Sequence, residues 1–527
     1  MSFHYSIAEG SPPFVAQHLL QLVVGTTFLA TISLTFYRLY VHPLRKVPGP
    51  FLARVTGLWR SALYFRGTWF DDSIELHRKY GPVVRISPNE VSVVSPDLNK
   101  TIYSHHKGTA KTNWYNIWST IGGSQSQQNG VFDSTDPKEH GFLRKRVSTV
   151  YTLSSILSLE SKVQEVMNSL WERFDEFEKK QEPVNLSRWA SYFTYDVVGT
   201  LCFSQPMGFI HAGGDHTNFI EGIHMSFYWI SNIGYLPFKN YLLFNPITRL
   251  LDRIFRLRMA EHFSVFARFA GNKVIERIKE NRTEKLDMLD HFLDIKDRQG
   301  RPAGLLAVYS EMGNILAAGA DTTSVAIKAI LGPLLRDPLR YRRLQSELDE
   351  AYKTFGIAVG QPVSYSMLKD LPFLQACVKE GSRLHPSIVY QLPRKAPSGG
   401  IELEGFFIDP SSTISMSPLT QNRCKAIFGN DADVWKPERW IVGEPNTEDQ
   451  IRSMDKNLAT FGYGSRTCIG RNLANVETTK FLAEILTRYD VELLNPAQPW
   501  SIHSQWFAEI HNMTIRLHKR GDAAAKA

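Results

Sequence analysis

A loop near the C-terminus holds the residues whose types and spacing are best suited to chemistry. It reads Phe-Gly-Tyr-Gly-Ser-Arg-Thr-Cys-Ile-Gly over residues 461–470. Gly462 and Gly464 allow the backbone to turn tightly and to approach a flat ligand, and Arg466 adds a fixed cation just before Cys468. We expect a helix over about residues 469–489, whose first N–H groups and dipole favour the thiolate form of the cysteine. A thiolate held in this way is a strong axial ligand for a haem iron. The alternative is a buried structural cysteine beside a glycine loop.

A second group of candidate reactive side chains lies in an apolar stretch, residues 305–335, which contains few charged residues and predicts a long, buried central helix. Its middle reads Ala-Ala-Gly-Ala-Asp-Thr-Thr over residues 317–323. Asp321 and Thr322 cost stability inside an apolar helix unless they are used or well hydrogen-bonded. Gly319 and its neighbouring alanines are expected to leave room there for a diatomic ligand. The alternative is a patch of small residues that packs helices together.

A third candidate element begins at Asp136, which is expected to cap a helix with Pro137 in its first turn. His140 and Arg144 are four residues apart and therefore share a face of this helix. Desolvated donors of this kind suit an anionic carboxylate. A solvated basic face is the alternative.

These motifs resemble those of the cytochrome P450 monooxygenases. Phe461-x-x-Gly464-x-Arg466-x-Cys468-x-Gly470 is similar to the family's haem-binding signature, and residues 317–323 are similar to its Ala/Gly-Gly-x-Asp/Glu-Thr-Thr pattern. The resemblance extends over about residues 48–520. It implies that Cys468 is the metal ligand, that the cofactor is haem b, and that Asp321 and Thr322 are the catalytic pair. It also implies that the further cofactor-binding residues are Arg466, Phe461, Gly464, His140, Arg144 and Arg394.

An ion network is also implied by the resemblance. Glu380 and Arg383 share a helix face, and Pro-Glu-Arg439-Trp follows downstream. These residues are similar to the family's Glu-x-x-Arg and Pro-Glu-Arg triad, which supports the segment before the cysteine loop. Glu380, Arg383 and Arg439 are therefore expected to be structural rather than catalytic.

The elements that position these residues are mostly helical. Helical patterns dominate from about residue 136 to 355, β-branched runs at 83–87 and 91–94 predict a hairpin, and strand signals return near 402–408. We therefore expect a mainly α fold with a small β region, which the resemblance identifies as the cytochrome P450 fold preceded by a single N-terminal transmembrane helix.

The resemblance also indicates which segments face the substrate. They are mostly aromatic, aliphatic or small, which favours an apolar small molecule of moderate size. The segments are residues 114–131, 207–236, 317–322, 388–392 and 506–507.

Composition excludes several other classes of protein. The chain has 527 residues, a net charge of +8 and four cysteines without the paired spacing of a disulfide framework or a zinc site. No nucleic-acid motif or long basic run is present, so we expect no nucleic-acid partner. The mild positive charge favours anionic lipid or an acidic electron-donor protein.

The N-terminal region predicts a membrane anchor. Residues 11–37 carry no Lys, Arg, Asp or Glu and are long enough to cross a bilayer. Arg38, Arg45 and Lys46 follow, which predicts that the remainder of the chain is cytosolic. We assign residues 1–42 to the anchor, 43–50 to a proline-rich hinge and 51–527 to the haem-thiolate monooxygenase domain. A buried helix is the alternative reading of the anchor.

These observations predict a single-pass protein of the endoplasmic reticulum membrane that inserts one oxygen atom from O2 into an apolar small molecule. The resemblance is closest in style to fungal secondary-metabolite enzymes. It implies that the electrons come from a separate NADPH-cytochrome P450 reductase, with cytochrome b5 as a second donor. The alternatives are a haem-thiolate isomerase or dehydratase that needs no O2, and a non-catalytic haem sensor.

Overall fold

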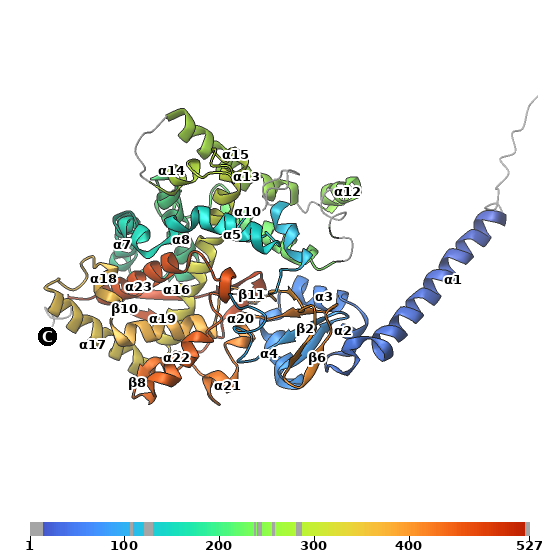
Figure 1. Cartoon of the computed structure of the whole chain (residues 1–527). Coiled ribbons are helices and arrows are strands. Elements are labelled where there is room, and N and C mark those ends of the chain that lie inside the picture. Colours follow the sequence, from blue (N-terminus) through green and yellow to red (C-terminus); the bar gives the residue numbers. More distant parts are fainter. Residues whose placement is uncertain are drawn as a thin grey trace, which may run out of the picture.

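A computed structural model describes residues 14–105, 109–120, 130–236, 239, 245–255, 259–280 and 287–521. Helices make up most of the molecule and the sheets are small, as the sequence predicts (Figure 1). The apolar helix α1 (Phe14–Phe36) extends away from the remainder of the chain.

The helices follow one another along the chain, with α1 continuing into a short π-helical turn (Tyr37–Val41). The first set is α2 (Phe51–Val55), α3 (Leu58–Arg66), α4 (Trp69–Tyr80), α5 (Pro137–Val147), α6 (Leu153–Ser158), α7 (Glu160–Lys180), α8 (Leu186–Phe203), α9 (Phe209–Ala212), α10 (Phe219–Ile233), α12 (Pro246–Phe255), α13 (Met259–Glu280) and α14 (Met288–Leu293). The second set is α15 (Leu305–Ala318), α16 (Ala320–Leu335), α17 (Pro338–Phe355), α18 (Tyr365–Leu368), α19 (Pro372–Leu384), α20 (Pro418–Gln421), α21 (Lys425–Phe428), α22 (Glu448–Lys456) and α23 (Arg471–Arg488).

The strands form small separate sheets. The largest has the order β1-β2-β7-β4, in which the predicted hairpin pairs antiparallel and β2 pairs parallel with β7. The strands are β1 (Val83–Ser87), β2 (Glu90–Val93), β3 (Val184–Asn185), β4 (Arg394–Lys395), β5 (Ile401–Leu403), β6 (Phe406–Ile408), β7 (Thr413–Ser415), β8 (Ile441–Val442), β9 (Pro445–Asn446), β10 (Tyr489–Leu493), β11 (Ser501–Gln505), β12 (Phe507–His511) and β13 (Thr514–Lys519).

The central helix is interrupted where the sequence predicts continuity. Residues 305–335 form two helices, α15 and α16, that meet at Gly319. A Cβ at Gly319 would lie 2.8 Å from the carbonyl oxygen of Ile315 and 3.0 Å from Val198 Cγ2 of α8. The glycine therefore allows α8 to pack closely against the central helix. Val198 fills the side of Gly319 that faces α8, and the expectation that this stretch leaves room for a diatomic ligand stays a prediction.

Candidate functional site

The glycine loop positions Cys468 through its backbone. The N–H of Cys468 donates to the carbonyl oxygen of Phe461 at 2.8 Å and closes the loop. Gly462 and Gly464 have φ values of +69° and +66°, which side chains rarely tolerate. A Cβ at Gly464 would lie 2.0 Å from the carbonyl oxygen of Tyr103. Glycine is therefore required at position 464.

The thiol of Cys468 is exposed, whereas Cys202, Cys377 and Cys424 are buried. It lies just before α23, and the N–H groups of Gly470 and Arg471 donate toward it and lower its pKa, as does the nearby guanidinium of Arg144. Desolvation by the surrounding protein is the larger effect and raises the pKa of the thiol. The predicted backbone donors are therefore present, and a metal ion deprotonates a coordinating thiol outright.

Basic side chains gather close to the loop. Arg394 is buried and donates to the hydroxyl of Tyr115 at 2.8 Å. Arg466 donates to the carbonyl oxygen of Ser134 at 2.7 Å, and desolvation together with the neighbouring Arg394 lowers its pKa to about 10. Two of the predicted cofactor-binding arginines are therefore brought together.

The sequence gives no indication that Lys111 joins this cluster. Its side chain is buried, its ammonium group donates to the carbonyl oxygen of Phe132, and it lies 3.9 Å from the ring centroid of Tyr115. Desolvation and then the charges of Arg394 and Arg466 hold the pKa of Lys111 well below its ordinary value. A buried ammonium group in a positive environment is costly unless an anion compensates it.

The two predicted residues of α5 lie at different places. His140 is buried, and desolvation together with Arg466 and Lys111 lowers its pKa to about 3, so that it is neutral at physiological pH. Arg144 is half-buried and lies in the field of Cys468 and Arg471, on the side of the sulfur. Asp136 caps the helix as predicted, because its carboxylate accepts from the N–H of Lys138 at 2.8 Å.

This donor set fits a haem. The cluster combines several cations with one buried carboxyl, Asp133, whose pKa burial raises to about 6. The positive charge therefore exceeds the negative charge in a desolvated region, and two ligand carboxylates would restore the balance. The exposed Cys468 thiol supplies an axial ligand beside the same cluster. The basic members are Lys111, His140, Arg144, Arg394 and Arg466.

The predicted pair on the central helix has distinct partners. Asp321 is buried, and its two carboxylate oxygens accept from Tyr195 Oη of α8 and contact His224 Nε2 of α10, each at 2.8 Å. Thr322 is half-buried and donates to the carbonyl oxygen of Ala318 at 2.8 Å. The side chain of Asp321 therefore faces α8 and α10. The hydroxyl of Thr322 bonds across the interruption at Gly319, to the carbonyl oxygen of Ala318.

An aromatic cluster is built from the segments predicted to face the substrate. Trp118 lies at its centre, with ring-centroid distances of 5.6 Å to Trp114, 5.6 Å to Phe132, 5.3 Å to Phe227 and 4.6 Å to Trp506. The indole N–H of Trp118 is buried and finds no acceptor among the residues that the structure describes. Residues 121–129 of the predicted segment lie outside the described residues.

Contacts along the chain join this cluster to the central helix. Phe227 of α10 lies 4.8 Å from Phe507, measured between ring centroids, and Phe507 pairs with Ile388 in an isolated bridge. Ser387 then donates to the carbonyl oxygen of Thr322 at 2.6 Å. The structure thus connects four of the predicted substrate-facing segments with one another and with the central helix.

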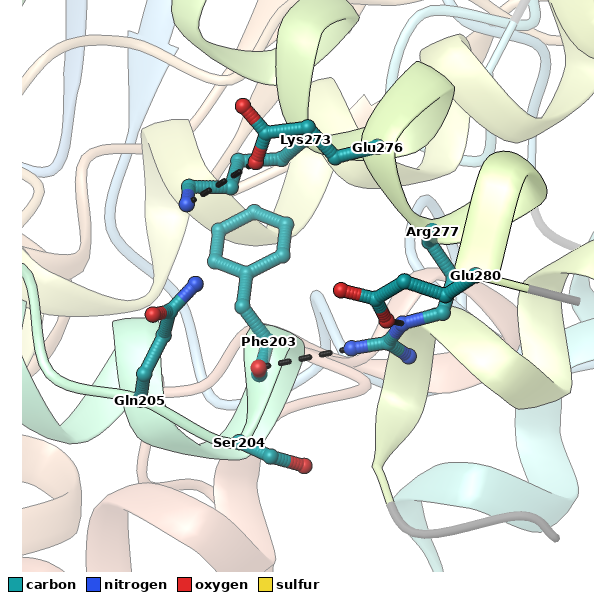
Figure 2. Close-up of a pocket in the computed structure, with 7 residues that line it drawn as sticks. All are labelled: Phe203, Ser204, Gln205, Lys273, Glu276, Arg277 and Glu280. Atoms are coloured by element: carbon teal, nitrogen blue, oxygen red, sulfur yellow. Dashed lines mark hydrogen bonds and ion pairs between the residues drawn. The ribbon is translucent and has the colours of Figure 1, made fainter. Parts of the chain in front are cut away.

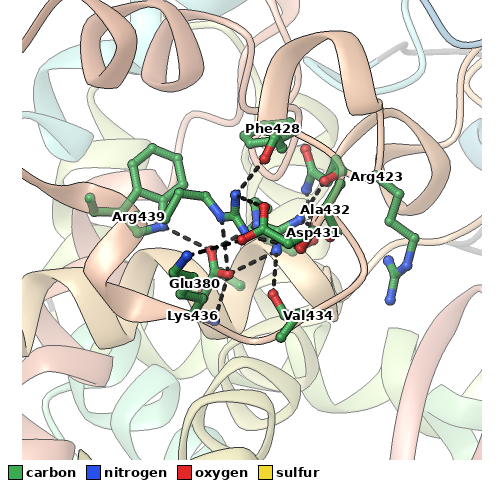
Figure 3. Close-up of polar contacts among 12 residues, drawn as sticks. Glu380, Arg423, Phe428, Asp431, Ala432, Val434, Lys436 and Arg439 are labelled. Atoms are coloured by element: carbon green, nitrogen blue, oxygen red, sulfur yellow. Dashed lines mark hydrogen bonds and ion pairs between the residues drawn. The ribbon is translucent and has the colours of Figure 1, made fainter. Parts of the chain in front are cut away.

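The predicted ion network is present around Glu380 (Figure 3). Glu380 and Arg383 are fully buried and form two hydrogen bonds of 2.7 and 2.8 Å. Arg439 lies 3.4 Å from Glu380 and also pairs with Asp431 at 2.8 Å. Trp440 Nε1 donates to Glu380 at 3.0 Å. The predicted three-residue network therefore contains two further members, Asp431 and Trp440.

A separate polar pocket lies between the end of α8 and α13 (Figure 2). Its charged groups already have partners, since Lys273 pairs with Glu276 and Arg277 pairs with Glu280 and Asp287. These elements carry none of the predicted haem-binding residues, so this pocket is not a candidate for an apolar substrate. The lining residues are Phe203, Ser204, Gln205, Lys273, Glu276, Arg277 and Glu280.

Comparison with known proteins agrees with this geometry. The cytochrome P450 family profile matches residues 48–517. The chain is 31% identical to cytochrome P450 monooxygenase gsfF of Penicillium aethiopicum over 494 residues, which cover 93% of this chain and 96% of that protein. It is 30% identical to cytochrome P450 monooxygenase cicH of Emericella nidulans, with 93% and 97% covered. It is also 29% identical to pisatin demethylase of Fusarium vanettenii, with 93% and 94% covered. The chain therefore belongs to the cytochrome P450 family, as a monooxygenase whose cofactor is haem.

Proposed function

We propose that this protein is a membrane-anchored monooxygenase that inserts one oxygen atom of O2 into an apolar small molecule of secondary metabolism. The observation that carries the proposal is the exposed Cys468 thiol, held in a glycine loop beside an uncompensated group of cations. Haem, when bound, supplies the iron chemistry that activates O2. Cys468 is its protein ligand, and Phe461, Gly464 and Arg466 shape the loop around it.

The haem carboxylates are held by the basic cluster. Arg394 and Arg466 are the strongest candidates because neutral acceptors position both guanidinium groups, and among the described residues only Nη1 of each makes a hydrogen bond, which leaves other N–H groups for an anion. Lys111 joins them as a buried point charge, and His140 serves as a neutral N–H donor. Arg144 acts close to the sulfur and favours its thiolate form.

Asp321 and Thr322 supply protons to the oxygen-binding side of the helix. Thr322 can exchange its bond to Ala318 for a bond to a water or to the reacting oxygen, since the hydroxyl is both donor and acceptor. Asp321 lies one residue earlier and faces α8 and α10, so it can receive protons from outside the haem pocket. Thr322 therefore holds the proton at the reaction site, and Asp321 restores it.

The substrate is proposed to be an apolar, ring-containing molecule that carries a hydrogen-bond acceptor. The walls are rings of Trp114, Trp118, Phe227 and Trp506, which favour flat apolar surfaces. The N–H groups of Trp118 and Trp114 have no partner among the residues that the structure describes, and this favours a ligand oxygen, because a buried donor without a partner costs about 1–3 kcal/mol.

The membrane arrangement is supported by exposed apolar residues. The side chains of α1 are exposed from Gln17 to Leu34, for example Leu20 at 64% and Phe28 at 63%. Phe51 and Leu58 are exposed just after the hinge, and Ile254 of α12 is exposed as well. Figure 1 places α2, α3 and α12 toward the end of the molecule from which α1 extends. We propose that residues 1–42 anchor the protein in the endoplasmic reticulum membrane, that 43–50 form the hinge, and that residues 51–527 face the cytosol.

Electrons are proposed to come from NADPH-cytochrome P450 reductase, with cytochrome b5 as a second donor, because the net charge of +8 favours acidic partners.

Purified protein, reductase and NADPH should consume O2 and place one 18O atom from labelled O2 into the product. Turnover without reductase would instead indicate a haem-thiolate isomerase. Haem binding without any turnover across a panel of aromatic metabolites would indicate a sensor.

The substrate class has its own test. Pairs of aromatic ligands that differ by one carbonyl or ether oxygen should differ about tenfold in affinity, as read from the haem spectrum, and Trp118→Phe should abolish that difference. Equal affinities for both members of each pair in the unmodified protein would refute the role of the Trp118 N–H.

A further inference from the structure

A polar network beside the central helix includes several residues to which no role has been assigned above. It joins α8, α10, α16 and β12 around Asp321. His224 Nε2 lies 2.8 Å from one oxygen of Asp321, and Tyr195 donates to the other at 2.8 Å. Lys328 Nζ lies 2.6 Å from Glu509 Oε2, and the ligand atoms of His224, Asp321 and Glu509 all lie within 4.8 Å of one another.

This arrangement contains balancing charges. A protonated His224 and Lys328 provide two cations, and Asp321 and Glu509 provide two anions. The ammonium group of Lys328 already pairs with the carboxylate of Glu509. Its positive charge would repel a metal ion at the same position. The cluster is therefore a compensated ion network rather than a metal site.

Among the described residues, only one hydrogen-bond partner of Asp321 leads toward solvent. The side chain of Asp321 is fully buried, and Tyr195 is buried as well. The side chain of His224 is 30% exposed, and its Nδ1 makes no hydrogen bond within the part of the chain that the structure describes. A proton that travels between solvent and Asp321 therefore has its shortest path through His224.

We propose that His224 is the positioning residue that holds Asp321 ionised and exchanges its protons with solvent. The inference rests on the proposed proton-relay role of Asp321. In the transfer, the Nε2–H bond of the His224 imidazolium breaks and an O–H bond forms on Asp321. Asp321 then passes this proton toward Thr322 and becomes a carboxylate again. The neutral imidazole turns its ring to solvent and is reprotonated there, so one proton enters and no electron moves.

The charged groups that face His224 support its protonated form. Asp321 and Lys328 face it from α16, Glu509 and His511 face it from β12, and Tyr195 contacts the same carboxylate from α8. Burial lowers the pKa of His224, but the Asp321 carboxylate outweighs this effect and raises the pKa to about 9. His224 is therefore charged at physiological pH.

The raised pKa of His224 determines how its contribution to the free energy of unfolding changes with pH. Because the folded pKa of about 9 lies above the ordinary value of 6.5, the contribution of His224 to stability is complete below about pH 6.5 and is lost as the pH rises through 9. In the haem-loaded protein, His224→Gln should therefore lower Tm at pH 6 and have a much smaller effect at pH 10. In an Asp321→Asn background the same substitution should have little effect at either pH. A decrease in Tm that is equal at both pH values would overturn the proposal.

A kinetic measurement separates proton exchange from simple positioning. His224→Gln and Tyr195→Phe form a matched pair, because each alters one hydrogen bond to Asp321 and only the histidine leads to solvent. With haem content and the carbon monoxide spectrum unchanged, His224→Gln should slow reductase-driven O2 consumption at least tenfold and increase the solvent isotope effect. Tyr195→Phe should slow it less than about threefold.

The outcome for Asp321→Asn distinguishes two kinds of failure. If Asp321→Asn is slow and His224→Gln matches the unmodified protein, the inference about His224 is wrong and the relay role of Asp321 remains. If Asp321→Asn itself matches the unmodified protein, the proposed relay fails, and the role of His224 fails with it.

Discussion

The side-chain oxygen of Asn422 accepts a hydrogen bond from the backbone N–H of Ala459 at 2.7 Å. The carbonyl oxygen of Asn422 accepts from Arg383 Nη1, also at 2.7 Å. The amide of Asn422 also donates to Thr460 Oγ1 at 3.1 Å. Because residues 459 and 460 directly precede Phe461, this one residue connects the buried ion network to the loop that carries Cys468.

The network should therefore stabilise both the fold and the cofactor site. Glu380→Gln leaves the guanidinium groups of Arg383 and Arg439 without their shared carboxylate. We expect the free energy of unfolding to fall by about 3–5 kcal/mol, with loss of haem content, as measured by denaturant titration and haem absorbance. Glu438→Gln is the matched control, since Glu438 pairs with Arg340 at the partly exposed surface and should cost at most about 1 kcal/mol. Equal effects of the two substitutions would contradict a special role for the buried network.

The exposed cysteine is predicted to be the only protein ligand of the iron. Cys468→Ala should abolish the red-shifted Soret band that thiolate-ligated haem shows with carbon monoxide after reduction. Alanine at Cys202, Cys377 or Cys424 should leave this band in place, because those thiols are buried, whereas Cys468 is exposed. An unchanged band in Cys468→Ala would refute the assignment.

Much of this site could be predicted from the sequence because its geometry is local. The glycine φ values, the cap at Asp136 and the start of α23 close to Cys468 all follow from neighbouring residues. The hairpin of β1 and β2 is also set by adjacent residues.

The missed residues depend on contacts between distant segments. His224 and Asp321 are 97 positions apart and meet only because α10 packs beside the central helix. Lys111 lies in a segment without a helical or strand pattern. It joins the basic cluster only because the fold brings it close to Arg394 and Tyr115. Nothing in the spacing of these residues indicates such contacts.

Lys111 provides a test of the haem carboxylate site in both forms of the protein. Lys111→Met removes a buried cation whose pKa desolvation lowers, so the haem-free protein should become more stable. The haem-loaded protein loses a charge-assisted contact worth about 1.5–3 kcal/mol, and haem affinity should fall at least tenfold. Haem transfer to an acceptor protein measures the affinity. Lys395→Met, an exposed neighbour of Arg394, is the control, and similar haem loss from both variants would contradict the assignment.

The proposed topology can be tested through glycosylation. Asn512 is exposed and begins an Asn-Met-Thr acceptor sequence, yet a cytosolic location keeps it from the lumenal glycosylation machinery. Glycosidase treatment of the protein from its native host should cause no mass shift. An acceptor sequence added at the N-terminus should be modified, since that end is expected in the lumen. A glycan on Asn512 would show that this part of the chain lies in the lumen and would contradict the proposed topology.

Substitutions of Asp321 and Thr322 on the central helix should distinguish a defect in proton supply from a defect in oxygen binding. Thr322→Ala removes a hydroxyl that contacts neither Cys468 nor the ion network, so haem content and the thiolate spectrum should persist. Coupling should fail instead: O2 and NADPH are still consumed, more hydrogen peroxide is released and less product forms. Asp321→Asn should slow O2 consumption itself, because proton supply becomes limiting, and groups of this kind contribute about 10²–10⁴-fold to rates.

Two further variants sharpen that comparison. Thr322→Ser retains the hydroxyl and should restore most of the coupling. Thr323→Ala removes a similar bond, from Thr323 Oγ1 to the carbonyl oxygen of Gly319 at 3.0 Å, and should leave the ratio of product to NADPH close to that of the unmodified protein. If Thr323→Ala uncouples as strongly as Thr322→Ala, the defect arises from the shape of the interrupted helix at Gly319, and the specific role of the Thr322 hydroxyl is wrong.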